Sequence, residues 1–266
     1  MIKLIVSDLD GTIVPEGTFD INPEFDKVFS TFIDKGVNVI LASGRHANNI
    51  KKLLPMIKDR AYILSDTGAT LIHDDKALIK HHLNEDTVKY LISYLHDEVG
   101  CEVALSNDVG YYTEPRDKFI NDNVFADVDE VGYIVDDIND YLEGVTKLTV
   151  MTKDSVQEVM APLKEKFKDE LHIVQSGSIW FDITKIGVTK GEGVKFVQKL
   201  LGIKKEETIG FGNSENDIPL LNECGMAYTV EDASDAVKKH ANEVLPDVFN
   251  NGVLNELKRI LTQQFT

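Results

Sequence analysis

One short segment near the N-terminus constrains the fold more than any other: an apolar run that ends directly on two acidic residues. Residues 3–7 (KLIVS) are largely apolar and partly β-branched, and the segment 8–12 (DLDGT) follows at once. A strand that is apolar on both faces is typical of the buried middle of a parallel sheet. Because open α/β sheets build their sites where such strands end, this segment predicts a parallel sheet with two carboxylates at its functional edge.

Strand and helix patterns alternate in the first and last thirds of the chain. Further buried strands are expected at residues 37–42, 61–65, 208–211 and 226–230, and further helices at 215–222 and 251–262. Asn22 and Thr189 are helix-starting residues, and each precedes apolar side chains at helical spacing. Gly36 and Gly202 then stand where helix-ending glycines belong. This alternation predicts an α/β fold with a doubly wound, Rossmann-like parallel sheet.

The middle of the chain follows a different pattern and is expected to form a second domain. Residues 147–152 and 179–184 alternate apolar and polar side chains, as strands with one polar face do. We therefore expect an inserted α/β domain, a cap, at about residues 84–186. The core domain is then built from residues 1–83 together with residues 187–266.

Composition and charge argue against several classes of protein. The chain carries 28 Lys and Arg against 45 Asp and Glu, a net charge of −17, whereas binding to duplex nucleic acid needs a cationic surface. A small anionic substrate stays compatible with this charge, because a local pocket can oppose the overall field. No run approaches the ~20 apolar residues of a membrane span, and the first apolar segment is too short for a signal peptide. With two distant cysteines, Cys101 and Cys224, we expect a soluble cytoplasmic protein whose thiols are buried and inert.

The two acidic residues of the first turn have a chemistry of their own. One carboxylate could act as a nucleophile while the other transfers protons. Two carboxylates so close repel each other unless a cation lies between them, and Mg²⁺, which prefers oxygen ligands, is the simplest candidate. The alternative is an ordinary acidic loop, since Asp-x-Asp occurs often by chance. The apolar strand before Asp8 and the Gly-Thr pair after Asp10 favour the functional interpretation.

Four motifs in order along the chain resemble those of the haloacid dehalogenase (HAD) superfamily of aspartyl-phosphate hydrolases. They are the segments 8–12 (DLDGT), 41–45 (LASGR), 187–191 (GVTKG) and 211–217 (FGNSEND). The inserted middle domain resembles the class IIB cap of the Cof-like branch, so the resemblance covers essentially the whole chain. Two positions depart from the family pattern: Asn213, where an Asp metal ligand is usual, and Thr67, where the branch usually carries Asn.

The resemblance implies a role for each motif residue. Asp8 would attack phosphorus and form an aspartyl phosphate, and Asp10 would protonate the leaving oxygen and then activate water. Phosphoryl oxygens would be held by Leu9, Ser43, Gly44, Lys190 and Asn216. Mg²⁺ would be bound by Asp8, the backbone carbonyl of Asp10 and Asn213, with Thr12 and Asp217 in supporting positions. Because Asn213 stands in place of a carboxylate, we expect it to weaken Mg²⁺ binding.

The resemblance implies the substrate only as a class, a small phosphorylated metabolite such as a sugar phosphate, pyridoxal phosphate or flavin mononucleotide. Arg45 and Arg116 are candidates for contact with this substrate. In the cap, Tyr111, Tyr112 and Trp180 could face the cleft, although aromatic side chains more often pack the core of their own domain.

Other classes of function fit the sequence less well. A phosphate-accepting signalling receiver would be shorter, would lack the inserted domain and would carry its acceptor Asp after a later strand, whereas Ser43 ends the second strand here. A nucleotide-binding fold would suit the architecture, but the sequence has neither a Gly-x-x-x-x-Gly-Lys-Ser/Thr loop nor a Gly-x-Gly-x-x-Gly motif after a strand. Two alternatives stay open. One is a catalytically weak protein of the same fold that binds a phosphometabolite, motivated by Asn213 and Thr67; the other is a phosphosugar mutase, which would share the aspartyl phosphate.

Overall fold

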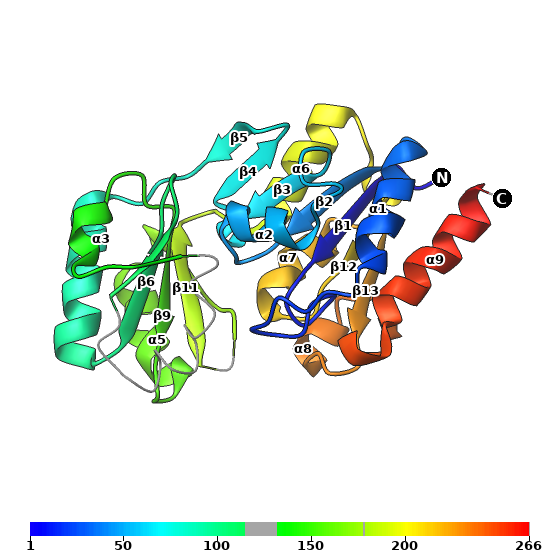
Figure 1. Cartoon of the computed structure of the whole chain (residues 1–266). Helices are drawn as coiled ribbons and strands as arrows, with labels where there is room; N and C mark the ends of the chain where they lie inside the picture. The colour runs from blue at the N-terminus through cyan, green and yellow to red at the C-terminus, as the bar shows by residue number, and fades with distance from the viewer. Residues whose placement is uncertain (115–131, 178, 266) are drawn as a thin grey trace. The chain divides into compact units, whose positions relative to one another are not determined.

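The computed structural model describes residues 1–114, 132–177 and 179–265. The chain divides into two compact units (Figure 1). The first unit contains Met1–Leu78 and Thr189–Thr266, and the second contains Ile79–Val188. Arg116, a candidate for substrate contact, lies outside the described residues.

The first unit is built on an eight-stranded sheet. Its strands are β1 (Leu4–Asp8), β2 (Asn38–Ala42), β3 (Tyr62–Ser65), β4 (Thr70–His73), β5 (Lys76–Lys80), β12 (Thr208–Phe211), β13 (Met226–Val230) and β14 (Glu243–Leu245). They follow the order β14-β13-β12-β1-β2-β3-β4-β5, and every pair from β14 to β3 runs parallel, which confirms the predicted parallel sheet (Figure 1). All five residues of β1 are buried, because this strand has neighbours on both sides and helices over the sheet.

Two strands at one edge of this sheet differ from the expected parallel arrangement. β4 pairs antiparallel with β3, and β5 continues the sheet beyond β4; the last two residues of β5, Ile79 and Lys80, belong to the second unit. The turn between β4 and β5 contains Asp74 and Asp75, whose φ angles are 50° and 55°. Asp enters this left-handed region more readily than most residues, and two such residues in succession suit a tight hairpin. The hairpin is not expected from the sequence, because β5 is largely exposed and lacks the apolar run of a buried strand.

Helices cover the sheet of the first unit. They are α1 (Glu24–Asp34), α2 (Ala47–Leu53), α6 (Lys190–Leu201), α7 (Ile218–Asn222), α8 (Asp235–Lys238) and α9 (Gly252–Phe265). α1 packs against α9, and α6 packs against α7. α6 has the limits that the sequence predicts: the Thr189 hydroxyl accepts a hydrogen bond from the N–H of Glu192 at 3.2 Å, and Gly202 ends the helix with a φ of 66°.

The second unit is an α/β layer with its own sheet. Its strands are β6 (Glu102–Ser106), β7 (Tyr111–Thr113), β8 (Tyr133–Ile134), β9 (Lys147–Met151), β10 (Leu171–Gln175) and β11 (Trp180–Lys185), in the order β10-β11-β9-β6-β7-β8. One face of this sheet joins α3 (Glu85–Ser93) and α5 (Val156–Lys166) in a single apolar core. The opposite face carries a buried ion pair between Lys147 and Asp182, whose Nζ and Oδ1 atoms lie 3.1 Å apart.

The aromatic residues of the second unit divide between these two faces. Tyr112 belongs to the apolar core, where its ring stacks on that of Tyr141 at 4.3 Å between centroids. Tyr111 and Trp180 lie on the opposite face and pack against Ala104 and Met151. Tyr112 therefore packs its own domain, and of the three aromatic candidates only Tyr111 and Trp180 lie on the face away from the helices.

Two expectations drawn from composition can be compared with the structure. Cys101 and Cys224 are buried and form no disulfide, as predicted. Burial raises the pKa of both thiols, that of Cys224 to about 12. Within the described residues, every helix is too short or too polar to cross a membrane.

Candidate active site

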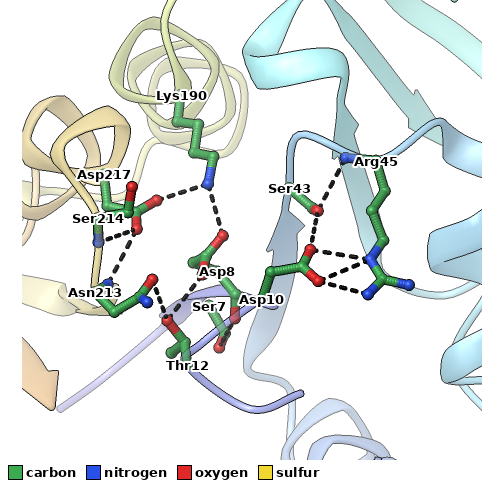
Figure 2. Close-up of polar contacts among 10 residues, drawn as sticks. All are labelled: Ser7, Asp8, Asp10, Thr12, Ser43, Arg45, Lys190, Asn213, Ser214 and Asp217. Carbon is green, nitrogen blue, oxygen red and sulfur yellow. Dashed lines mark hydrogen bonds and ion pairs between the residues drawn. The ribbon is translucent and has the colours of Figure 1, made fainter. Parts of the chain in front are cut away.

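The sequence motifs of the first unit meet at one edge of its parallel sheet (Figure 2). β1 lies between β12 and β2, and all three strands run in the same direction, so their carboxyl ends share one edge. Asp8 ends β1, Ser43 directly follows β2, and Asn213 follows β12. Lys190, the first residue of α6, reaches the same edge with its ammonium group. This is the edge at which open α/β sheets place their sites.

The tight turn after β1 depends on a glycine. Gly11 has a φ of 76°, in the left-handed region that favours glycine. A Cβ atom at this position would lie 2.0 Å from the Nδ2 atom of Asn213, so a larger residue would collide with the side chain from the neighbouring strand end. The carbonyl of Leu9 accepts a hydrogen bond from the N–H of Thr12 at 3.1 Å. The turn therefore folds Thr12 back over the end of β1, beside Asp8.

A buried chain of charges runs through the centre of the site. The Lys190 ammonium donates to Oδ1 of Asp8 and to Oδ1 of Asp217, each at 2.6 Å. The three side chains are at most 5% exposed. The second oxygen of Asp217 accepts hydrogen bonds from the backbone N–H groups of Asn213 and Ser214, both at 3.0 Å. Asp217 thus fixes both the cation and the loop after β12, and Lys190 joins that loop to β1.

The charges of this chain shift one another's pKa values. Burial and the nearby Asp217 carboxylate raise the pKa of Asp8 to about 7, against the opposing attraction of Lys190. Burial acts to lower the pKa of Lys190, but the carboxylates of Asp217 and Asp8 outweigh it and hold that pKa above its ordinary value. Lys190 therefore stays positively charged. Two carboxylates against one ammonium leave the site with a net negative charge, which favours a further cation beside Asp8.

Oxygen donors of a kind suited to Mg²⁺ surround Asp8. The Thr12 hydroxyl donates to Oδ2 of Asp8 at 2.8 Å and lies 3.2 Å from Oδ1 of Asn213. The carboxylate and the carboxamide oxygen therefore converge on one small region, and carboxylate, amide and backbone oxygens are the ligands that a hard cation prefers. The described residues hold no cluster of three or more His, Cys, Asp or Glu side chains suited to a metal ion. The donor set fits Mg²⁺, with Asn213 contributing an uncharged oxygen.

The carboxylate of Asp10 is held by a guanidinium. Arg45 donates through Nε to Oδ1 and Oδ2 of Asp10 at 3.1 and 2.9 Å, and through Nη2 to Oδ1 at 2.5 Å (Figure 2). The Ser43 hydroxyl lies 3.3 Å from Oδ2 of the same carboxylate. Arg45, a candidate for substrate contact, is thus placed on Asp10, and Ser43 lies beside it.

The remaining candidates for phosphate binding lie in the loops after β2 and β12. Gly44 stands between Ser43 and Arg45 in the first of these loops. Asn216 lies in the short helix η6 (Glu215–Asp217). The residue is 8% exposed, and its Oδ1 atom has no hydrogen-bond partner among the described residues. A half-turn of this carboxamide would put its NH₂ group in the same place, as a hydrogen-bond donor for an anion.

The structure adds residues that the motifs did not include. The backbone N–H groups of Asp66 and Thr67 donate to the carbonyls of Arg45 and Ser43, both at 3.1 Å, and so support the loop after β2. Asp66 and Thr67 have φ angles of 52° and 59°. The departure from the family pattern at Thr67 pointed to this turn. No pattern in the sequence marked Phe19, whose ring centroid lies 4.4 Å from the guanidinium carbon of Arg45.

Comparison with protein families finds one model that matches most of the chain. The model describes haloacid dehalogenase-like hydrolases, and it matches residues 5–257. The match therefore spans both parts of the first unit and all of the second unit.

Individual proteins match over nearly the whole chain as well. The 5-amino-6-(5-phospho-D-ribitylamino)uracil phosphatase of Escherichia coli strain K12 is 24% identical, over 99% of this chain and 97% of its own length. A solved structure from Eubacterium rectale is 28% identical with a TM-score of 0.82, and covers 98% of this chain and 99% of its own. The structure of a HAD subclass IIB sugar phosphatase has a TM-score of 0.83 at 22% identity, over 97% of this chain and 98% of its own. The last of these shows the shared fold, cap included.

Proposed function

The chain belongs to the haloacid dehalogenase-like hydrolases, and on that premise we propose that it is a Mg²⁺-dependent phosphatase that acts through an aspartyl phosphate at Asp8. The proposed substrate is a small phosphorylated metabolite. The proposed nucleophile is Asp8, and the proposed acid and base is Asp10. Nucleic acid is not an expected partner, given the net charge of −17.

The observation that carries this proposal is the buried chain Asp8–Lys190–Asp217 at the end of β1. The desolvation penalty of buried charges can exceed their attraction, and replacing a buried ion pair by well-packed apolar residues is often neutral or stabilising, so stability alone does not account for this chain of charges. Perturbed, buried ionisable groups at such a sheet edge are typical of a catalytic site. Here the arrangement leaves one carboxylate, Asp8, aligned by a fixed cation on one oxygen and a hydroxyl on the other.

The proposed reaction has two steps. In the first, an oxygen of Asp8 bonds to phosphorus, the bond from phosphorus to the leaving oxygen breaks, and Asp10 gives that oxygen a proton. In the second, water attacks phosphorus, Asp10 takes its proton, and the bond from phosphorus to Asp8 breaks, which releases inorganic phosphate and restores both carboxyl groups. Lys190 and the amide of Asn216 are suited to stabilise the charge on the phosphoryl oxygens in both steps. Ser43, Gly44 and the backbone N–H of Leu9 are the further expected contacts for those oxygens.

Mg²⁺ would be held by Asp8, the backbone carbonyl of Asp10 and Asn213, with Thr12 and Asp217 as supporting residues. When bound, it would neutralise phosphoryl charge and align the phosphorus with Asp8. The carboxylate of Asp217 would keep Asn213 in place, because its Oδ2 atom accepts a hydrogen bond from the backbone N–H of Asn213 at 3.0 Å.

A sugar phosphate or a similar polyhydroxylated phosphate is the proposed substrate class. Support comes from the names of matched proteins, one a sugar phosphatase and one a phosphatase of a ribityl compound. The cytoplasm is the expected location of the reaction.

Phosphate release over a panel of phosphorylated metabolites tests the proposal. The panel would be assayed with and without Mg²⁺, using the native chain, Asp8→Asn and, as a matched control, Asp59→Asn. Asp59 is an exposed residue of the first unit, outside the site. We expect release that requires both Mg²⁺ and Asp8 and that is unchanged in the control. Folded protein that releases no phosphate from any compound would contradict the proposal, and transfer of phosphate to a second sugar in place of water would indicate a mutase.

A further inference from the structure

The guanidinium of Arg45 lies on the carboxylate of Asp10, and we propose that Arg45 positions Asp10 for proton transfer. This makes Arg45 a positioning residue, which acts through Asp10 and not through contact with the substrate. The inference rests on the proposed function, in which Asp10 first gives a proton to the leaving oxygen and then takes one from water.

The contact between the two side chains has the geometry of a clamp. Nε of Arg45 lies within 3.1 Å of both carboxylate oxygens, and Nη2 lies 2.5 Å from Oδ1. The second N–H of Nη2 meets the carbonyl of Thr18, also at 2.5 Å. Three of the five N–H groups of Arg45 are therefore used inside the protein. A planar guanidinium that donates from two nitrogens fixes the plane of a carboxylate as well as its position.

The clamp is itself held from several directions. The ring centroid of Phe19 lies 4.4 Å from the guanidinium carbon, which is within the range of a cation–π contact. The backbone N–H of Arg45 donates to the Ser43 hydroxyl at 3.0 Å, and its carbonyl accepts from Asp66 at 3.1 Å. The side chain is 13% exposed. An Arg that served as a mobile surface group for the substrate would not be fixed at its backbone, its charged end and its flat face together.

Asp10 depends on this clamp for its position. Among the described residues, its carboxylate has one other hydrogen-bond partner, the Ser43 hydroxyl at 3.3 Å. Without Arg45, Asp10 would be free to turn, and a small displacement of a catalytic group is costly: about 1 Å can reduce the rate 100-fold.

This role makes a prediction that depends on the leaving group. A group that departs readily as an anion needs little help from Asp10 in the first step, whereas a poorer leaving group needs the proton. Phenyl phosphate and 4-nitrophenyl phosphate differ by one nitro group, and phenol is the poorer leaving group of the two. The value of kcat/KM reports the first step only, while kcat also includes the second, in which Asp10 serves both substrates alike.

The experiment compares Arg45→Gln and Arg45→Lys with the native full-length chain on these two substrates in the presence of Mg²⁺. For Arg45→Gln we expect kcat/KM to fall by about tenfold or more on phenyl phosphate and by less than about threefold on 4-nitrophenyl phosphate. The kcat values for both substrates should fall together, because the second step slows. Arg45→Lys should lose less activity than Arg45→Gln, since lysine keeps the positive charge but lacks the planar pair of nitrogen donors.

Arg60→Gln is the matched control, because Arg60 also pairs with an Asp of the first unit, Asp34, at 2.5 Å, outside the site. It should leave all constants unchanged, and circular dichroism would verify that each variant is folded. An equal loss of kcat/KM on the two substrates, or no loss, would overturn the inference while leaving the proposed function intact. So would a higher KM on both substrates together with weaker inhibition by inorganic phosphate, because that would make Arg45 a phosphate ligand. If the folded native chain releases phosphate neither from these aryl phosphates nor from any metabolite of the panel, the proposed function itself fails, and this inference fails with it.

Discussion

At the scale of single residues, the backbone conformation, charge or hydrogen bonding of each site residue is set by its neighbours. Gly11 combines a φ of 76° with a neighbour 2.0 Å from where its Cβ would be. Lys190 neutralises two carboxylates that would otherwise be buried side by side. Asn213 meets the end of β1 with an uncharged oxygen, 3.2 Å from the Thr12 hydroxyl. Each of these features leads to a measurable property of one residue.

The first prediction concerns the uncharged oxygen of Asn213. Asn213→Asp would add a carboxylate to the proposed Mg²⁺ ligands, and the charge of the ligands sets affinity for such cations. We expect Mg²⁺ to bind about tenfold more tightly, a gain of about 1.4 kcal/mol. Isothermal titration calorimetry of the chain with Mg²⁺ alone would measure it. Asn255→Asp, on an exposed part of α9, is the control. Equal affinity in Asn213→Asp and the native chain would show that residue 213 is not a ligand.

The second prediction concerns Thr67, which has a φ of 59°. A β-branched side chain in this region is an outlier, and such strain costs about 1–3 kcal/mol. Asn tolerates the left-handed region, so Thr67→Asn should raise the free energy of unfolding by about 1 kcal/mol, and the melting temperature by about 2–4 °C. Calorimetry of the native chain and of the variant would measure the change. Lower stability in Thr67→Asn would mean that the threonine's own contacts outweigh the strain.

At the scale of elements, sequence predicts those parts of the fold whose residues obey a strong local rule. β1 is apolar because it is buried on both faces, and α6 is bounded by a capping Thr189 and a left-handed Gly202. The β4–β5 hairpin lacks such a pattern, since β5 is an exposed edge strand. The same holds within the site: the motifs marked the ends of β1, β2 and β12, but the contact between Phe19 and Arg45 joins loops with no periodic pattern. Contacts of that kind follow from tertiary packing, which a single sequence does not display.

The third prediction concerns the N-terminus of α6, the helix that carries Lys190. The Thr189 hydroxyl accepts a hydrogen bond from the N–H of Glu192 at 3.2 Å. Thr189→Ala removes this cap and should lower the free energy of unfolding by about 0.5–2 kcal/mol, whereas Thr189→Ser should keep most of it. Urea denaturation followed by circular dichroism would measure both. If Ala and Ser were equally stable, the cap would contribute nothing.

At the scale of the whole molecule, the chain forms two units, each with a buried apolar interior and one cysteine. Cys224 lies in the first unit and Cys101 in the second. Both are at most 5% exposed. Because the two thiols are in different units, they can report separately on the opening of each.

The fourth prediction uses these thiols. Burial raises both pKa values, that of Cys224 to about 12, so at pH 8 the reactive thiolate is scarce in the folded protein. We expect neither thiol to react with Ellman's reagent at pH 8 without denaturant, and both to react in urea. Raising the pH towards 10 should speed the reaction of Cys101 before that of Cys224. Cys101→Ser and Cys224→Ser would assign the signals, and rapid labelling of the native protein would show that a unit opens readily.

The division of the first unit into two stretches of sequence has a consequence for synthesis on the ribosome. β1 pairs with β12 through Leu4 and Thr208, which are 204 residues apart in the sequence. Translation proceeds at about 5–20 residues per second, so roughly 10–40 seconds pass between the synthesis of β1 and that of β12. During that time one edge of an apolar strand has no native neighbour, and such edges are where aggregation begins. The second unit is contiguous, so it can fold while the nascent chain is still growing, and the hydrolase core closes only after the ribosome has delivered the last third of the protein.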